Sequence, residues 1–134
     1  MTITNKGFSN QWEKAYSSGR HLSIFPWTDL VILVNKFAQP SIFKKNNPKV
    51  LEIGCGAGAN ISFLKNIGFK YNGIDGSDTA INLCRNRFPD IKKFLIKGDF
   101  SESFKFEKKF DLIIDKASLT HNTTIILQFQ NIIQ

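Results

Sequence analysis

The sequence predicts an α/β fold built around a parallel sheet, and three observations support this prediction. Short apolar runs typical of buried strands alternate along the chain with segments of helical period. The first strand, predicted over 50–53, leads directly into a glycine-rich turn that reads GCGAG at 54–58. The next strand ends in an acid, Asp75. Together these features predict a strand–turn–helix–strand unit whose glycines let the backbone approach a ligand closely.

Two helices are predicted before this unit. Trp12, Ala15 and Tyr16 share one face of a short helix over 10–17. A second helix is predicted over 26–38, because proline is tolerated at a helix start and apolar residues then recur at helical spacing. Its apolar stripe, expected to pack on the sheet, consists of Leu30, Val31, Val34, Phe37 and Ala38.

The remaining elements follow from apolar periodicity and from glycine, proline and capping signals. In chain order they are a helix over 60–67, a strand over 69–74, a helix over 78–88, strands over 91–97 and 110–115, and a helix over 123–133. Gly68 closes the first of these helices, and Ser77 is a good N-cap for the second. The strand over 110–115 is apolar enough to be buried on both faces.

A nucleoside is the ligand that these residues predict, since the glycines allow close approach and the Asp75 carboxylate suits ribose hydroxyls. Two cofactor classes remain open, because the turn also satisfies the dinucleotide fingerprint GxGxxA with Gly54, Gly56 and Ala59. Glu52 favours one of them. A pyrophosphate at this turn would be repelled by the carboxylate, whereas S-adenosylmethionine has no phosphate and brings an ammonium. We therefore predict S-adenosylmethionine, with NAD as the less favoured alternative.

Four motifs follow one another at strand ends between residues 49 and 121: VLEIGCGAGAN, GIDGSDTAI, KGDF and FDLIIDKASLTH. In this order they resemble the motifs of class I S-adenosylmethionine-dependent methyltransferases. The resemblance implies a Rossmann-like three-layer α/β/α fold with parallel strands in the order 3-2-1-4. Residues 28–134 would form a partial methyltransferase domain that lacks the C-terminal strands of the full seven-stranded sheet. Residues 1–27 would form an N-terminal lid segment over the cofactor.

The resemblance also assigns roles to individual residues. Glu52 and the glycine turn would hold the methionine portion of the cofactor, and Asp99 with Phe100 would hold the adenine. Arg20 would pair with the cofactor carboxylate, or else be an exposed loop charge. His121 is the candidate general base, needed only if the acceptor is a hydroxyl. The complete set of predicted cofactor-binding residues is Arg20, Glu52, Gly54, Cys55, Gly56, Asp75, Gly76, Ser77, Asp99, Phe100 and Asp115.

The methyl acceptor is predicted to be a small molecule, methylated on oxygen or nitrogen. The loop after the fourth strand reads DKAS at 115–118. It lacks the (D/N)PPY pattern of enzymes that methylate exocyclic amines of bases or amides. The rival from another class is a non-catalytic module that binds S-adenosylmethionine or a nucleoside. No metal site is predicted, because the histidines and cysteines do not fall at ligand spacing.

Composition and charge exclude some classes of binding partner. The formal net charge is +7, from 18 Lys and Arg against 11 Asp and Glu, but the lysines are scattered, which argues against nucleic acid. No apolar stretch is long enough to span a membrane, and the N-terminus lacks the apolar core of a signal peptide. The two cysteines form no disulfide framework. These features predict a cytoplasmic protein.

The fourth strand would form a hydrophobic edge of the sheet, which is a liability in water. Three explanations are open. The chain is truncated relative to a longer ancestral domain, two copies pair through this edge into a homodimer, or the helix over 123–133 covers it. Truncation is the explanation that we favour.

Overall fold

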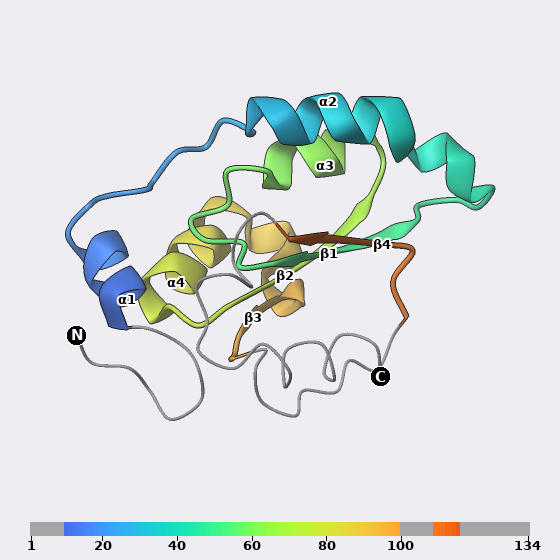
Figure 1. The fold of residues 1–134 in the computed structure, drawn as a ribbon. Coiled ribbons are helices and arrows are strands. Elements are labelled where there is room, and N and C mark those ends of the chain that lie inside the picture. Colours follow the sequence, from blue (N-terminus) through green and yellow to red (C-terminus); the bar gives the residue numbers. More distant parts are fainter. Residues whose placement is uncertain (1–9, 100–108, 116–134) are drawn as a thin grey trace.

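The computed structural model describes residues 10–99 and 109–115. Helices and strands follow one another as the apolar pattern predicts (Figure 1). Their bounds are α1 Asn10–Ser17, α2 Thr28–Phe37, η1 Pro40–Phe43, β1 Lys49–Ile53, α3 Ile61–Ile67, β2 Lys70–Asp75, α4 Asp78–Arg87, η2 Pro89–Phe94, β3 Leu95–Lys97 and β4 Leu112–Asp115.

The four strands of the described chain form one sheet in the order β3-β2-β1-β4, with every pairing parallel. β1 lies between β2 and β4, so that Ile53 is opposite both Ile74 and Asp115. Asp75 at the end of β2 is opposite Lys97 at the end of β3. The carboxyl ends of parallel strands meet at one edge of the sheet, where ligands bind in open α/β folds. The predicted Rossmann-like fold and strand order are confirmed.

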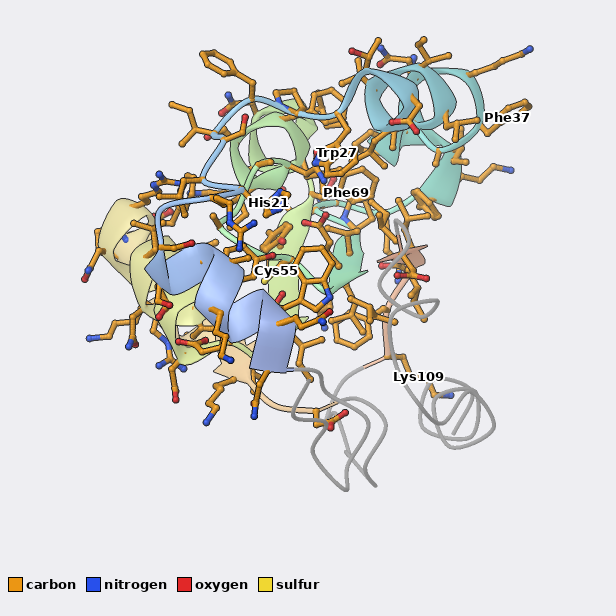
Figure 2. All side chains as sticks on the ribbon, turned by 60° about the vertical axis from the view of Figure 1, so that its left-hand side comes forward. His21, Trp27, Phe37, Cys55, Phe69 and Lys109 are labelled. Atoms are coloured by element: carbon orange, nitrogen blue, oxygen red, sulfur yellow. The ribbon has the colours of Figure 1, made fainter. Side chains whose placement is uncertain are left out.

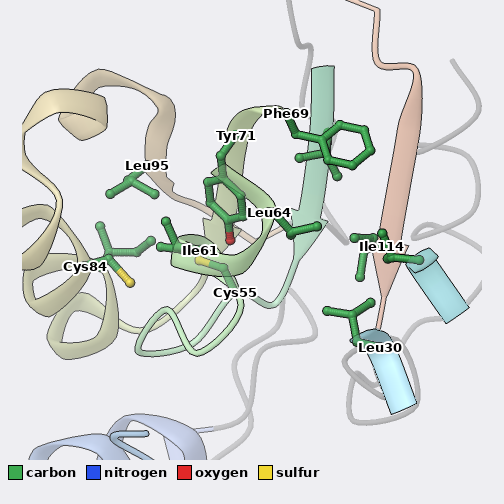
Figure 3. Packing of buried hydrophobic residues seen from close by; sticks show 12 residues of the cluster. Leu30, Cys55, Ile61, Leu64, Phe69, Tyr71, Cys84, Leu95 and Ile114 are labelled. Atoms are coloured by element: carbon green, nitrogen blue, oxygen red, sulfur yellow. The ribbon is translucent and has the colours of Figure 1, made fainter. Parts of the chain in front are cut away.

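The core lies between the sheet and the helices α2, α3 and α4. Successive strand residues point to opposite faces, and Val50, Tyr71 and Leu95 point to the face that these helices cover. Figure 3 shows Tyr71 among the side chains of α3 and β3. The buried members of this cluster are Leu30, Val34, Val50, Cys55, Ile61, Leu64, Phe69, Tyr71, Ile81, Cys84, Leu95 and Ile114.

The ends of α3 and α4 form as the sequence predicts. Ser77 Oγ accepts a hydrogen bond from the Ala80 N–H at 3.1 Å, which satisfies a donor that the start of α4 leaves unpaired. Gly68 ends α3 with a φ of 119°, and its N–H donates to the last carbonyls of the helix. Ser77 lies just after the carboxyl end of β2, and Gly68 lies shortly before the start of β2.

The third strand is shorter than predicted. Residues 89–94 form the 3₁₀ helix η2, with Pro89 in its first turn, and only Leu95–Lys97 pair with β2. A short apolar run does not distinguish a strand from a turn of helix, and Pro89 favours the start of a helical turn. The prediction of a strand over 91–97 is therefore wrong for its first half.

The stripe predicted for α2 is only partly buried. Leu30 and Val34 are 8% and 3% exposed and face the core, but Phe37 is 62% exposed. Figure 2 shows Phe37 at the far end of α2, on its outer side. The helix also begins at Thr28, after the loop that contains Pro26. Phe37 lies seven residues after Leu30 and so shares its helical face, but it is the last residue of α2, where the helix has left the buried core.

β4 is buried on one face. Ile114 is 6% exposed, whereas Ile113 is 41% exposed, so the prediction of burial on both faces is wrong for this strand. The helix predicted over 123–133 lies outside the described residues, and pairing of two copies along the β4 edge stays a prediction. None of the helices within 10–99 and 109–115 is long and apolar enough to cross a membrane.

Candidate functional site

The candidate site begins at the turn that joins β1 to α3. Gly54, Gly56 and Gly58 have φ values of 69°, 56° and 90°, in the left-handed region that glycine adopts most readily. The N–H groups of Gly54 and Cys55 both donate to the Ile74 carbonyl, at 2.8 and 3.1 Å. The turn is therefore fixed by backbone bonds against the end of β2.

Asp75 is the last residue of β2 and borders the same turn. Its Oδ2 accepts from the Gly56 N–H at 2.8 Å, and its Oδ1 accepts from the Ser77 N–H at 2.9 Å. Burial raises the pKa of Asp75, and the backbone donors oppose this effect. Each carboxylate oxygen has a second lone pair, so the group can accept a ligand hydroxyl while keeping both bonds.

Glu52 stands at the end of β1, beside the turn. We expected its carboxylate at the mouth of the turn, but the residue is only 4% exposed. One oxygen accepts from the Tyr71 hydroxyl at 2.5 Å and the other from the Asn60 amide at 2.7 Å. Burial raises the pKa of Glu52 to about 7, although both hydrogen bonds act in the opposite direction. The carboxylate thus titrates near neutral pH, where a nearby ammonium would favour its ionised form.

Helix α1 packs on α4 (Figure 1), and its Tyr16 packs against Ala57 of the turn. The Glu13 carboxylate accepts hydrogen bonds from the hydroxyls of Ser77 and Thr79. Burial raises the pKa of Glu13, but these hydrogen bonds outweigh it and leave the pKa below its ordinary value. The Tyr16 hydroxyl lies so close over Gly56 that a Cβ built there would stand 2.6 Å from it. Tyr16 therefore fills the space that the glycine leaves open.

Two side chains of α4 hold the turn from the other side. The Arg87 guanidinium donates to the Ala57 carbonyl at 2.9 Å and to the Leu22 carbonyl at 3.1 Å. The Cys84 thiol donates to the Gly56 carbonyl at 3.1 Å. Arg87 thereby links the glycine turn to the segment that follows α1.

The family of this chain follows from a comparison with protein-family models. Residues 50–132, more than half of the chain, match the model described as "Methyltransferase domain". The chain belongs to the methyltransferase domain family. The matched span contains the glycine turn, Glu52 and Asp75, which lie at the carboxyl edge of the sheet, where ligands bind in open α/β folds. The comparison with curated proteins gave no match.

Solved structures agree with the methyltransferase domain fold. The structure reported for the conversion of a disulfide bond into a thioacetal group during echinomycin biosynthesis is 25% identical, with a TM-score of 0.57 over 73% of this chain and 39% of that chain. The glycopeptide N-methyltransferase MtfA, complexed with sinefungin, is 15% identical, with a TM-score of 0.64 over 85% and 46%. A methyltransferase from Thiobacillus denitrificans, in complex with S-adenosyl-L-homocysteine, is 16% identical, with a TM-score of 0.64 over 96% and 51%. The chain thus spans about two fifths to one half of these proteins.

The methyltransferase domain gathers most of the predicted cofactor-binding residues at one edge of the sheet. Those that lie at the ends of β1 and β2 are Glu52, Gly54, Cys55, Gly56, Asp75, Gly76 and Ser77. The Gly98 N–H donates to the Asp75 carbonyl at 3.0 Å, which brings the neighbouring Asp99 to this edge. Asp115 ends β4 opposite Ile53 and is exposed.

The hydrogen bonds of Arg20 are made within its own segment and not with the glycine turn. Arg20 is exposed, and its Nε donates to Ser18 Oγ at 3.3 Å. Together with Trp12 and His21 it lines a hollow of about 400 Å³ beside α1. Its pairing with a cofactor carboxylate stays a prediction. Phe100 and His121 lie outside the described residues, so their predicted roles stay predictions too.

Sequence reasoning missed the side chains that hold the site together. Tyr71 could have been found, since it stands opposite Val50 in the parallel register and so shares the face of Glu52. Glu13 gave no such signal, because its partner Ser77 lies 64 residues away in the sequence. The other missed residues are Tyr16, Asn60 and Arg87.

Proposed function

We propose that this methyltransferase domain binds S-adenosylmethionine and transfers its methyl group to a small molecule. One observation carries the proposal: two buried carboxylates, Glu52 and Asp75, flank a glycine turn at the carboxyl edge of a parallel sheet. The family match and the neighbours that bind S-adenosyl-L-homocysteine or sinefungin support the choice of cofactor.

The residues fit S-adenosylmethionine better than a dinucleotide. A pyrophosphate at the turn would lie near both carboxylates, and like charges at such distances repel strongly where water is excluded. The ammonium of S-adenosylmethionine would instead be attracted to Glu52. Its ribose hydroxyls could donate to Asp75, whose two oxygens are held in place by backbone N–H groups. NAD therefore remains the less favoured cofactor.

We also propose that α1 acts as a lid. Tyr16 fills the space over Gly56, where a ligand would approach the turn, so a bound cofactor requires α1 to shift. The contacts of α1 with α4 include hydrogen bonds of Glu13 with two hydroxyls, together with apolar packing. Such contacts can break and re-form without disturbing the sheet. In this proposal α1 opens to admit the cofactor and closes over it.

Bound S-adenosylmethionine would supply a methyl group that its sulfonium already activates, so no nucleophile on the protein is required. The residues of this chain would bind the cofactor, orient it toward the acceptor and exclude water from the site. Glu52 would fix the amino acid end of the cofactor and Asp75 the ribose. Tyr16 and the rest of α1 would shield the site from solvent. His121 would accept a proton only if the acceptor is a hydroxyl.

A small molecule is the acceptor class that we propose. The loop after β4 reads DKAS, which lacks the (D/N)PPY pattern used on bases and amides. One structural neighbour is described as a glycopeptide N-methyltransferase, so this fold serves acceptors other than nucleic acid. Methylation would fall on an oxygen or a nitrogen of the acceptor.

The test is transfer of a labelled methyl group from S-adenosylmethionine to a panel of small hydroxylated and aminated metabolites. We expect transfer to at least one acceptor and its loss in the Asp75→Asn variant. Asp90→Asn is the matched control, because Asp90 is an exposed residue paired with Lys65 on the surface. Cofactor binding without transfer to any acceptor would favour the non-catalytic module. Absence of binding would overturn the proposal.

A further inference from the structure

Asn60 precedes the first residue of α3 but does not cap this helix. An asparagine at this position usually accepts a hydrogen bond from a backbone N–H of the first turn, and Asn60 makes no such bond. Its Nδ2 instead donates to Glu52 Oε2 at 2.7 Å, and its Oδ1 accepts from the Trp27 N–H at 3.0 Å. The residue is 3% exposed. The buried Asn60 amide therefore makes two hydrogen bonds with other segments, to Glu52 and Trp27, in place of a cap on α3.

The second of these bonds holds the start of α2. Trp27 is the residue that precedes α2, and no side chain of its own caps the helix. Its N–H is one of the groups that the start of a helix leaves unpaired, and Asn60 satisfies it. Trp27 itself is 49% exposed, and Ile24 and Phe25 before it are 50% and 75% exposed. One amide thus joins the acid of the candidate site to a segment with large exposed apolar side chains.

We propose that Asn60 is a positioning residue that orients the Glu52 carboxylate for the ammonium of the cofactor and couples it to the segment 24–27. The inference rests on the proposed function. Tyr71 and Asn60 hold one carboxylate oxygen each, so together they fix the plane of the carboxylate. An ammonium that draws Glu52 toward it also draws the Asn60 amide, and the Trp27 N–H must follow or lose its acceptor.

The pH dependence of cofactor binding reports on this arrangement. Binding of an ammonium needs an ionised Glu52, and the Asn60 donor favours that form. Among the residues that the structure describes, the other titratable groups that act on Glu52 include Tyr71 and Asp75 on β2, Asp115 on β4, Cys55 in the turn and Tyr16 on α1. None of these groups changes when Asn60 is replaced, so a shift in the pH profile isolates its contribution.

Two variants separate the two bonds of Asn60. Asn60→Leu has nearly the same shape and removes both bonds, whereas Asn60→Asp keeps an acceptor for the Trp27 N–H and places a second carboxylate beside Glu52. Asn72→Leu is the matched control, because Asn72 is an amide of β2 on the opposite face of the sheet and donates to the Val50 carbonyl. Calorimetric titration with S-adenosyl-L-homocysteine across a pH series gives the pH midpoint of binding, below which the ligand no longer binds.

We expect this midpoint to rise by about one pH unit in Asn60→Leu, since a hydrogen bond to an ionised group is lost. Asn60→Asp should raise it as well, and Asn72→Leu should leave it unchanged. Circular dichroism first establishes that each variant is folded. If Asn60→Leu does not fold, the comparison of Asn60→Asp with Asn72→Leu decides the matter. Equal midpoints in all folded variants would overturn the inference.

Trp27 provides a second readout, which a merely structural amide would not change. The Trp12→Phe background leaves Trp27 as the single tryptophan of a sequence that has two. S-adenosyl-L-homocysteine should shift the emission of Trp27 in this background and in Asn60→Asp, but not in Asn60→Leu. The same shift in Asn60→Leu would contradict the coupling. Failure of the parent protein to bind the ligand at any pH would contradict the proposed function instead.

Discussion

The glycine turn and helix α1 border the same site but are held in different ways. The turn is fixed by backbone bonds from Gly54 and Cys55 to the end of β2, in addition to the side-chain bonds from Arg87 and Cys84. Helix α1 is held by side chains, with Glu13 bonded to two hydroxyls of α4 and Tyr16 packed over the turn. Backbone bonds of this kind break only when the sheet edge itself opens, whereas side-chain contacts can exchange locally. The difference separates a glycine turn that stays in place from a helix α1 that can move.

Two glycines with similar backbone angles allow the largest test of this comparison. Gly58 in the turn has a φ of 90°, and an added Cβ would meet Ile61 Cδ1 at 2.8 Å and Cys84 Sγ at 3.1 Å. Gly19 after α1 has a φ of 86°, and an added Cβ would meet nothing within 4 Å. Gly58→Ala should therefore reduce the free energy of unfolding by about 2–4 kcal/mol, from backbone strain and overpacking.

Gly19→Ala is the control for that variant, and it should reduce the free energy of unfolding by about 1 kcal/mol from backbone strain alone. Urea unfolding followed by circular dichroism measures both changes. Equal losses in the two variants would mean that the turn is no more tightly enclosed than the segment after α1.

Asp75 gives the second largest expected effect, on binding rather than on folding. Asp75→Asn replaces one acceptor oxygen with an amide that points a donor at a backbone N–H. The affinity for S-adenosyl-L-homocysteine should fall about 10- to 100-fold, since a charged acceptor of the ribose is lost. Calorimetric titration measures the change. An unaltered dissociation constant would show that the ribose does not bind at this carboxylate.

Replacing Glu13 should have a smaller effect. It should lower the stability of the fold and raise the rate at which the ligand binds. Glu13→Gln weakens two hydrogen bonds and should cost about 1 kcal/mol of stability. The pKa of Glu13 is below its ordinary value. The ionised side chain therefore stabilises the fold fully at any pH above the pKa of an unperturbed glutamate. This contribution is lost as the pH falls through the lowered pKa, and Glu13→Gln should show less of that loss. Thermal unfolding at several pH values measures this difference.

The same Glu13→Gln variant should bind S-adenosyl-L-homocysteine faster, because α1 opens more often. Stopped-flow fluorescence measures the association rate. A slower or unchanged rate in Glu13→Gln would indicate that α1 does not have to move before the ligand enters, which would remove the main difference between the two regions.

The smallest effect is expected at Lys65 and Asp90, which form an ion pair on the surface beside α3. Exposed pairs of this kind contribute little, because water and salt screen them. Asp90→Asn should leave the unfolding midpoint unchanged within error. A clear loss of stability would mean that surface charges, and not only backbone bonds and packing, hold the region around the turn.

The sequence predicts the glycine turn and its flanking strands well, because the residues that determine them are close together in the sequence. The order of strand, glycine turn, helix and acid lies within 49–75, and Ser77 and Gly68 signal helix ends through their own chemistry. The elements that failed depended on packing. Nothing local says that Phe37 would point outward or that residues 91–94 would turn before pairing.

The candidate site was predictable to the same extent. Glu52 and Asp75 were found because each stands at a strand end next to glycines. The partners that set their environment come from elsewhere in the chain: Asn60 and Tyr71 enclose Glu52, and Glu13 reaches α4 from the N-terminal helix. Sequence position indicated a carboxylate at the mouth of the turn, and only the packing of β2 and α3 around it makes that carboxylate buried.

Parallel calorimetric titrations with S-adenosyl-L-homocysteine and with NAD test the central claim most directly. Two buried carboxylates at the turn should accept the ligand that carries an ammonium and reject the one that carries a pyrophosphate. We therefore expect binding of S-adenosyl-L-homocysteine, weakened in Glu52→Gln, and no binding of NAD. Tight binding of NAD, together with no binding of S-adenosyl-L-homocysteine, would contradict the account.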